Sequence, residues 1–238
     1  MEEQEGKLID FKGFNWKTTG SDEKIIRFGK TTDFPERGIS IGECKALLEA
    51  LKVNKMHCPN ILETGQMFGT STRIFIGWAL RNSGATVYSC EIKPQPLFKE
   101  KMEEAGYWQY VHQLGDSRVI GWQIPIGFLF IDSRHLFQDA LGEYMRFRFW
   151  LKDGGIVGFH DTDNCTGVKL AIQIAKMIDD LEPISQSNEA SGIEFYRIKK
   201  HETGGLFIRQ LDYLNEELKA TQDKMEIKRK EEGNGKCS

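Results

Sequence analysis

The sequence predicts a doubly wound α/β fold, in which helices cover both faces of a mostly parallel sheet. Short apolar segments alternate with longer amphipathic segments along the centre of the chain, and this order builds strand–helix–strand units. Residues 126–131 are almost continuously apolar, as expected for a strand that is buried on both faces. The turn signal Asp153-Gly154-Gly155 separates a predicted helix from the strand that follows it.

The individual elements follow from capping residues, glycine breaks and hydrophobic periodicity. Ser40 and Glu43 form a capping-box pair, which indicates the start of a helix. Gly84 and Gly106 mark the ends of two later helices. In chain order we expect a helix over about 41–52, a strand over 60–63, a helix over 70–82, a strand over 85–90, a helix over 96–105, strands over 108–113 and 126–131, a helix over 136–150, a strand over 156–159, a helix over 167–180 and a strand over 193–199.

Composition and charge limit the class of protein. The 238 residues suffice for one large domain with appendages, and 39% hydrophobic with 28% charged residues is typical of a soluble globular chain. The net charge of −3 argues against general polyanion binding, and no Lys/Arg–aromatic stripe predicts a nucleic-acid partner. We find no apolar run that could span a membrane and no signal peptide. Five scattered cysteines indicate reduced thiols, so we expect a cytoplasmic location.

The chain divides into three predicted parts. Residues 1–38 are polar with isolated aromatic residues, and we expect an N-terminal arm or lid. Residues 39–203 contain the α/β pattern and form the predicted binding domain. Residues 204–238 are charged, and leucines recur there at helical spacing from Leu211 to Leu218, which indicates a helix followed by a disordered tail. This helix either docks on its own domain or joins copies of the chain into a homo-oligomer.

The segment from Ile61 to Thr72 contains the most informative pattern. A strand ends at Glu63, two glycines follow at Gly65 and Gly69, and a Thr/Ser cluster opens a helix. A glycine turn before a helix N-terminus forms a nucleotide-type binding corner. The pyrophosphate fingerprint G-x-G-x-x-G is absent, and Glu63 would repel a diphosphate. A ligand with a positively charged amino-acid end fits better, which favours S-adenosylmethionine over a dinucleotide.

Polar residues also follow every other predicted parallel strand, and such strand ends meet at the ligand-binding edge of an open sheet. Glu91 could accept both hydroxyls of a ribose, or it is an exposed acid at a strand end. Asp116 could accept a hydrogen bond from an adenine amine, or Gly115-Asp116-Ser117 is an ordinary turn. The polar strand ends are Glu63-Thr64-Gly65, Glu91, Gly115-Asp116-Ser117, Asp132-Ser133-Arg134-His135 and His160-Asp161-Thr162-Asp163.

Asp132, His135, His160 and Asp161 form the predicted chemical group of the site. Two carboxylates from neighbouring strand ends suit Mg²⁺, and a nitrogen ligand from His160 would shift the preference toward Mn²⁺, Zn²⁺ or Fe²⁺. His135, on the loop after Asp132, is placed to remove a proton from a hydroxyl. The alternatives are that His135 caps a helix and that His160 binds backbone.

The order of these motifs resembles class I S-adenosylmethionine-dependent methyltransferases. Within them it is most similar to the metal-dependent O-methyltransferase group that includes macrolide-sugar and rhamnosyl methyltransferases and cephalosporin-hydroxylase-like proteins. The resemblance covers about 40–200 and implies a seven-stranded, Rossmann-like sheet. It rests on Glu63-x-Gly65-x-x-x-Gly69-x-Ser71, Glu91, Gly115-Asp116-Ser117, Phe130-Ile131-Asp132-x-x-His135, Asp153-Gly154-Gly155 and His160-Asp161.

The resemblance implies a role for each matching residue. Asp132 and Asp161 would hold the metal, with His160 as a further ligand, and His135 would be the general base. The chain differs at His160, where such enzymes often carry a second acid, and also at Gly127 and Ser133. The implied cofactor-binding residues are Glu63, Thr64, Gly65, Gly69 and Ser71 near the methionine end, Glu91 at the ribose, Asp116 and Ser117 near the adenine, and Asp132.

The sequence therefore predicts an S-adenosylmethionine-dependent O-methyltransferase. The expected acceptor is a hydroxyl of a small molecule or sugar, and the expected metal is Mg²⁺ or Mn²⁺. Two alternatives remain open. One is a non-catalytic binding or assembly protein that keeps the methyltransferase fold, and the other is a dinucleotide-dependent oxidoreductase.

Overall fold

The computed structural model describes residues 21–30, 38–54, 58–82, 85–93, 95–104 and 106–199. These residues belong to the compact unit that ends at Lys199. The predicted C-terminal helix and tail at 204–238, and most of the predicted arm at 1–38, lie outside the described residues. Within these ranges no helix is both long and apolar enough to cross a membrane.

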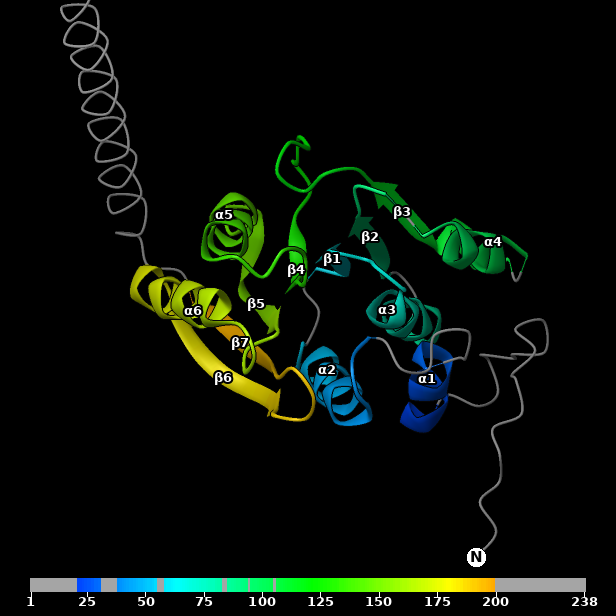
Figure 1. Cartoon of the computed structure of the whole chain (residues 1–238), viewed down its shortest axis with the longest axis horizontal. Helices are drawn as coiled ribbons and strands as arrows, with labels where there is room; N and C mark the ends of the chain where they lie inside the picture. Colours follow the sequence, from blue (N-terminus) through cyan, green and yellow to red (C-terminus); the bar gives the residue numbers. More distant parts are fainter. Residues whose placement is uncertain are drawn as a thin grey trace, which may run out of the picture. The chain divides into compact units, whose positions relative to one another are not determined.

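The core of the fold is a seven-stranded sheet with the order β3-β2-β1-β4-β5-β7-β6 (Figure 1). Strands β1 to β5 pair in parallel, and β7 is antiparallel to both β5 and β6, so the predicted mostly parallel, seven-stranded sheet is confirmed. The strand order reverses between β1 and β4, and such a switch point opens a crevice at the carboxyl ends of the strands. The strands are β1 (Asn60–Thr64), β2 (Thr86–Cys90), β3 (Val111–Leu114), β4 (Ile126–Ile131), β5 (Leu151–His160), β6 (Asp180–Ser187) and β7 (Ile193–Lys199).

Helices cover both faces of this sheet, as predicted (Figure 1). Alternate residues of the parallel strands point to opposite faces. Ile61 and Phe128 pack with α1, α2 and α3, whereas Leu62 and Leu129 pack with α5 and α6. The helices are α1 (Asp22–Gly29), α2 (Ile41–Val53), α3 (Thr70–Arg81), α4 (Pro96–Glu104), α5 (Phe137–Phe147) and α6 (Thr166–Ile178), and a 3₁₀ turn covers Trp108–Tyr110.

Several elements differ from the sequence prediction for identifiable reasons. Helix α1 forms inside the predicted arm, where Ile25 is completely buried, and the sequence does not predict it because its amphipathic pattern covers only eight residues. Strand β6 was not predicted, since it is polar and contains Pro183, which only an edge strand tolerates. The predicted turn at Asp153-Gly154-Gly155 lies inside β5, where Gly154 has a φ of 77° and the register with β4 shifts. The third strand begins only at Val111 because the 3₁₀ turn occupies its predicted start.

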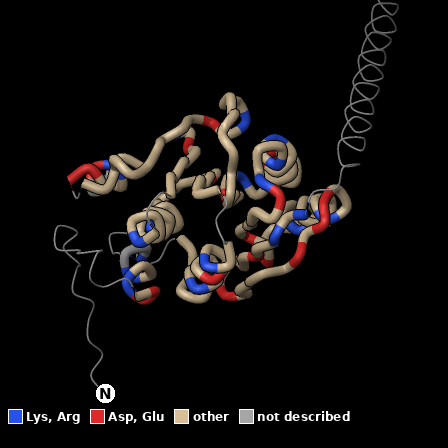
Figure 2. Tube along the Cα trace, turned by 180° about the vertical axis from the view of Figure 1, so that it is seen from behind, with Lys and Arg blue, Asp and Glu red and all other residues tan. Residues whose placement is uncertain are grey.

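Charged residues of both signs are interspersed along the described chain (Figure 2). Most of them are exposed, but a few acids are buried under the strand ends. Glu43 and Glu63 are completely buried and Glu143 nearly so. A buried carboxylate is stable only when hydrogen-bond donors surround it. Polar partners must therefore be grouped around these three side chains near the carboxyl edge of the sheet.

Candidate active site

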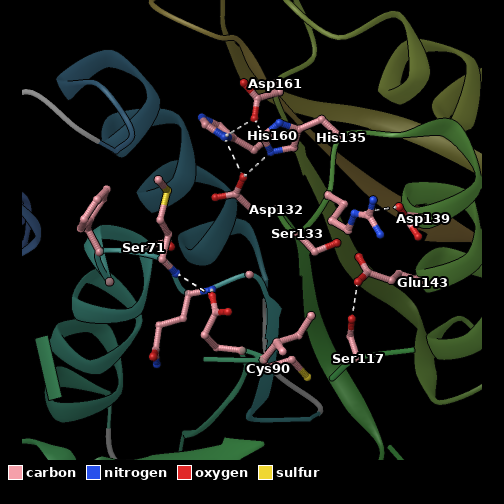
Figure 3. Close-up of a pocket in the computed structure, with 18 of the residues that line it drawn as sticks. Ser71, Cys90, Ser117, Asp132, Ser133, His135, Asp139, Glu143, His160 and Asp161 are labelled. Atoms are coloured by element: carbon pink, nitrogen blue, oxygen red, sulfur yellow. Dashed lines mark hydrogen bonds and ion pairs between the residues drawn. The ribbon is translucent and has the colours of Figure 1, made fainter. Parts of the chain in front are cut away.

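A pocket of about 400 Å³ lies at the carboxyl edge of the parallel strands (Figure 3). Its walls come from the loops after β1, β2, β3, β4 and β5 and from the segment before α2. The predicted residues in its lining are Gly65, Gly69, Ser71, Glu91, Asp116, Ser117, Asp132, His135, His160 and Asp161. The fold thus brings together residues from all five predicted strand ends.

The glycine turn has a shape that only glycine permits. Gly65 has a φ of 86°, and a Cβ atom there would lie 2.0 Å from the carbonyl oxygen of Asp132. Gly69, the N-cap of α3, has a φ of 71°, and a Cβ atom there would lie 2.2 Å from the ring of Phe98. The turn after β1 therefore packs directly against the end of β4, which joins the predicted cofactor corner to the predicted metal group.

Glu63 and Thr64 lie beneath the pocket and are not part of its lining. The Glu63 carboxylate accepts hydrogen bonds from the hydroxyls of Ser71, Thr72 and Ser89. Burial raises the pKa of Glu63 to about 7, although these hydrogen bonds lower it. Glu63 thus ties the start of α3 to β2, which shapes the glycine turn from below.

Glu91 reaches across the pocket from the end of β2 to the glycine turn. One of its oxygens accepts the backbone N–H groups of Gln66, at 3.3 Å, and Met67, at 3.1 Å. The other accepts the backbone N–H of Lys93 at 3.2 Å. These bonds hold the carboxylate in the pocket lining beside the glycine turn.

Asp116 and Ser117, from the loop after β3, also line the pocket and already have partners. Arg118 binds both oxygens of Asp116, and its hydrogen bonds lower the pKa of Asp116 to about 2. Ser117 donates to Glu143, a buried carboxylate on α5 that also accepts from Thr64 at 2.7 Å. The sequence does not predict a site role for Glu143, because its position on the amphipathic helix α5 does not reveal that it faces the strand ends.

Asp132, His135, His160 and Asp161 converge at the end of the pocket next to the glycine turn (Figure 3). The Nδ1 atom of His160 lies 2.9 Å from Asp132 Oδ1 and 3.2 Å from Asp161 Oδ2. The Nε2 atom of His135 lies 2.7 Å from Asp161 Oδ2 and 3.7 Å from Asp132 Oδ1. Each histidine therefore contacts both aspartates, which come from neighbouring strands.

These contacts change the ionisation of the group. Hydrogen bonds to Asp132 and Asp161 raise the pKa of His135 to about 10. Burial lowers the pKa of His160, but the charge of Asp132 and its hydrogen bond outweigh this effect and raise it to about 12. Burial likewise raises the pKa of Asp161, but the hydrogen bonds from the two histidines bring it well below its usual range. Without a cation, the two histidines therefore form ion pairs with Asp132 and Asp161.

The same side chains fit a divalent cation. Asp132, His160 and Asp161 each offer one ligand atom, and these three atoms lie within 4.8 Å of one another. Two carboxylates and one imidazole form a donor set for Mg²⁺ or Mn²⁺. Asp161 has a φ of 58°, a conformation rare outside glycine and a common sign of a functional site. His135 and Cys165 also approach Asp161 within this limit.

Comparisons with known proteins agree with the fold. Residues 62–162 match the model of a family described as "Methyltransferase domain", and no curated protein sequence matches the chain. The solved O-methyltransferase from Bacillus cereus, in complex with SAH, is 17% identical with a TM-score of 0.54, over 75% of this chain and 90% of that one. The SAH-bound methyltransferase PaMTH1 from Podospora anserina is 12% identical with a TM-score of 0.54, over 75% and 88%. CalS11, a TDP-rhamnose 3'-O-methyltransferase of calicheamicin biosynthesis, is 13% identical with a TM-score of 0.53, over 74% and 92%.

Proposed function

We propose that this chain, which contains a class I S-adenosylmethionine-dependent methyltransferase domain, methylates a hydroxyl of a small molecule or sugar with the help of a divalent cation. One observation carries the proposal. Two aspartates and two histidines converge beside the glycine turn, in the same pocket as Glu91. A methyl donor bound over that turn would have its reactive end next to a group that can bind and deprotonate a hydroxyl.

The transfer requires mainly alignment, because the sulfonium of the donor is already activated. The acceptor oxygen bonds to the methyl carbon while the carbon–sulfur bond breaks. S-adenosylhomocysteine leaves as a neutral thioether, and the hydroxyl proton passes to His135. His135 would be neutral and able to accept it when a bound cation offsets the charges of Asp132 and Asp161, which raise its pKa in the absence of a cation. The side chain of His135 is 42% exposed and lines the pocket, so an acceptor can reach it.

The cation would be held by Asp132, His160 and Asp161, the donor set described above. When bound, a divalent cation supplies Lewis acidity that lowers the pKa of a hydroxyl. The sugar class of acceptor is supported by the fold shared with a TDP-rhamnose 3'-O-methyltransferase, and the carboxylate-rich end of the pocket suits a polar, polyhydroxylated acceptor.

Calorimetric titration tests the two binding steps separately. We expect S-adenosylhomocysteine to bind and NAD not to bind, and we expect Mn²⁺ to bind with one site per chain. Asp161→Asn should abolish the Mn²⁺ heat but leave S-adenosylhomocysteine affinity within about threefold, because Asp161 lies outside the glycine turn. Asp163→Asn is the matched control, since Asp163 is an exposed acid two residues further along. Failure of S-adenosylhomocysteine to bind would refute the methyltransferase assignment.

Turnover tests the chemistry. The protein is incubated with S-adenosylmethionine, Mg²⁺ and a panel of nucleotide sugars and phenols, and release of S-adenosylhomocysteine is measured. We expect release with at least one hydroxyl acceptor and its loss in EDTA. If wild-type protein releases S-adenosylhomocysteine at the same rate with and without EDTA, and Asp161→Asn matches that rate, the proposed role of the cation is refuted. The methyltransferase assignment would still stand.

A further inference from the structure

We infer that Glu43 positions His160 for metal binding: it faces the Nε2 atom of the imidazole and so leaves Nδ1 directed at Asp132 and Asp161. The inference rests on the proposed metal site. Glu43 is a positioning residue in this scheme, since it contacts a ligand and not the cation or the acceptor.

Glu43 is a completely buried carboxylate in the first turn of α2. Its Oε2 atom accepts the backbone N–H of Ser40 at 2.5 Å, which completes the predicted capping box. Its Oε1 atom accepts the backbone N–H of Ser191 at 3.2 Å and lies 3.4 Å from Nε2 of His160. A capping box requires only one of these oxygens, so the second is available to the histidine.

The two ring nitrogens of His160 face different partners. Nδ1 lies between Asp132 and Asp161, while Nε2 points back toward α2. Within the part of the chain that the structure describes, this buried Nε2 has no acceptor in ordinary hydrogen-bond geometry, and Glu43 is its ion-pair partner. The imidazole is therefore placed between carboxylates on both sides.

A cation bound by the two aspartates would select one tautomer of His160. A neutral imidazole has one N–H and one lone pair, and the lone pair of the ligand nitrogen must face the cation. With Nδ1 directed at the site between Asp132 and Asp161, the single N–H then lies at Nε2, toward Glu43, whose ionised carboxylate can accept it. A carboxylate behind a histidine ligand fixes both the tautomer and the ring orientation, and its loss typically weakens metal binding about 10- to 100-fold.

Glu43→Gln is the informative variant. A glutamine has one acceptor oxygen where Glu43 has two, and three N–H groups surround this side chain, from Ser40, Ser191 and His160. The glutamine NH₂ group must therefore face either Ser40 or the pair of Ser191 and His160, and in both orientations the negative charge that faces Nε2 of His160 is lost. Ser40→Ala is the matched control, because it removes the hydroxyl that caps Glu43 N–H and leaves the carboxylate next to His160.

The experiment measures Mn²⁺ affinity from the electron paramagnetic resonance signal of free Mn²⁺, with S-adenosylhomocysteine affinity measured in parallel. We expect Glu43→Gln to weaken Mn²⁺ binding about 10- to 100-fold without changing S-adenosylhomocysteine affinity, and Ser40→Ala to keep the wild-type Mn²⁺ affinity. Equal Mn²⁺ affinity in wild-type protein and folded Glu43→Gln would overturn the role of Glu43 alone. Absence of Mn²⁺ binding by wild-type protein would instead overturn the proposed metal site.

A second measurement does not depend on a variant that folds. Long-range ¹H–¹⁵N NMR spectra of wild-type protein loaded with Mg²⁺ report which nitrogen of each histidine carries the proton. We expect His160, assigned by comparison with His160→Gln, to carry it on Nε2. A proton on Nδ1 would overturn the inference, because that nitrogen would then be unable to bind a cation.

Discussion

Glu63→Gln should change how the stability of the protein depends on pH. Burial raises the pKa of Glu63 from 4.5 to about 7 in the folded protein. A group with a raised folded pKa binds its proton more tightly in the folded state, so folding is favoured at low pH and this contribution is lost as pH rises. At about 1.4 kcal/mol per pH unit, the loss between pH 4.5 and 7 is about 3 kcal/mol.

The assay is urea denaturation of wild-type protein and Glu63→Gln at several pH values between 5 and 8. The glutamine cannot ionise, so the variant lacks this loss. We expect the free energy of unfolding of Glu63→Gln to rise relative to wild type by about 2–3 kcal/mol across this range, with little further change above pH 7. Glu100→Gln, at an exposed acid on α4, is the control and should track the wild type.

A difference between Glu63→Gln and wild type that does not vary with pH would refute the reasoning. The same variant also tests where Glu63 acts. Because Glu63 lies beneath the pocket and contacts Ser71, Thr72 and Ser89, S-adenosylhomocysteine affinity should change only a few-fold. If the variant binds S-adenosylhomocysteine more than about 100-fold more weakly, which is the size of effect expected from losing a direct hydrogen bond to a charged group, Glu63 contacts the cofactor.

Four further outcomes are expected. Gly65→Ala places a Cβ atom 2.0 Å from a backbone oxygen, so thermal melting and calorimetry should show lower stability and at least tenfold weaker S-adenosylhomocysteine binding; wild-type values for both would contradict the close contact. Glu91→Ala should weaken S-adenosylhomocysteine binding by about 1.5–3 kcal/mol, and unchanged calorimetric affinity in a folded variant would remove its ribose role. His135→Ala should lower turnover by about 10²–10⁴-fold at constant S-adenosylhomocysteine affinity, whereas an unchanged rate of S-adenosylhomocysteine release would exclude it as the base. Removing residues 206–238 should lower the mass per particle in light scattering if the predicted leucine stripe joins copies of the chain, and an unchanged mass would favour a docked helix.

The parts of the fold that the sequence predicted are those with strong local patterns. The boundaries of β4 agree with the prediction because residues 126–131 are continuously apolar. The polar strand ends could be grouped because parallel strands place their carboxyl ends on one edge. Strand β6 is polar and contains Pro183, and the amphipathic helix α1 has only eight residues, so neither stands out in the sequence; contacts with other elements stabilise both.

The side-chain partners within the site were harder to predict. For Asp116 the sequence leaves an adenine contact and an ordinary turn open, and it does not reveal that Arg118, only two residues away, binds both of its oxygens. The sequence predicts only a capping role for Glu43, since its contact with His160 joins segments far apart in the chain. Sequence patterns show which residue types lie near a strand end. Which of these side chains bind one another depends on how the helices and strands pack, and the sequence patterns do not show that.

Three buried carboxylates support the pocket, Glu143 within its lining and Glu43 and Glu63 beneath it, and the hydrogen-bond partners of each determine its charge. Glu63 and Glu143 accept hydrogen bonds mainly from hydroxyls, and burial raises the pKa of both. Glu43 is equally buried, yet its ion pair with His160 and the hydrogen bond from Ser40 outweigh that burial and lower its pKa. Hydroxyl partners rotate to suit either charge state, whereas the histidine partner requires a carboxylate. Neutral replacements at Glu63 and Glu143 should therefore be tolerated better than Glu43→Gln, whose effect falls on the ligand set itself.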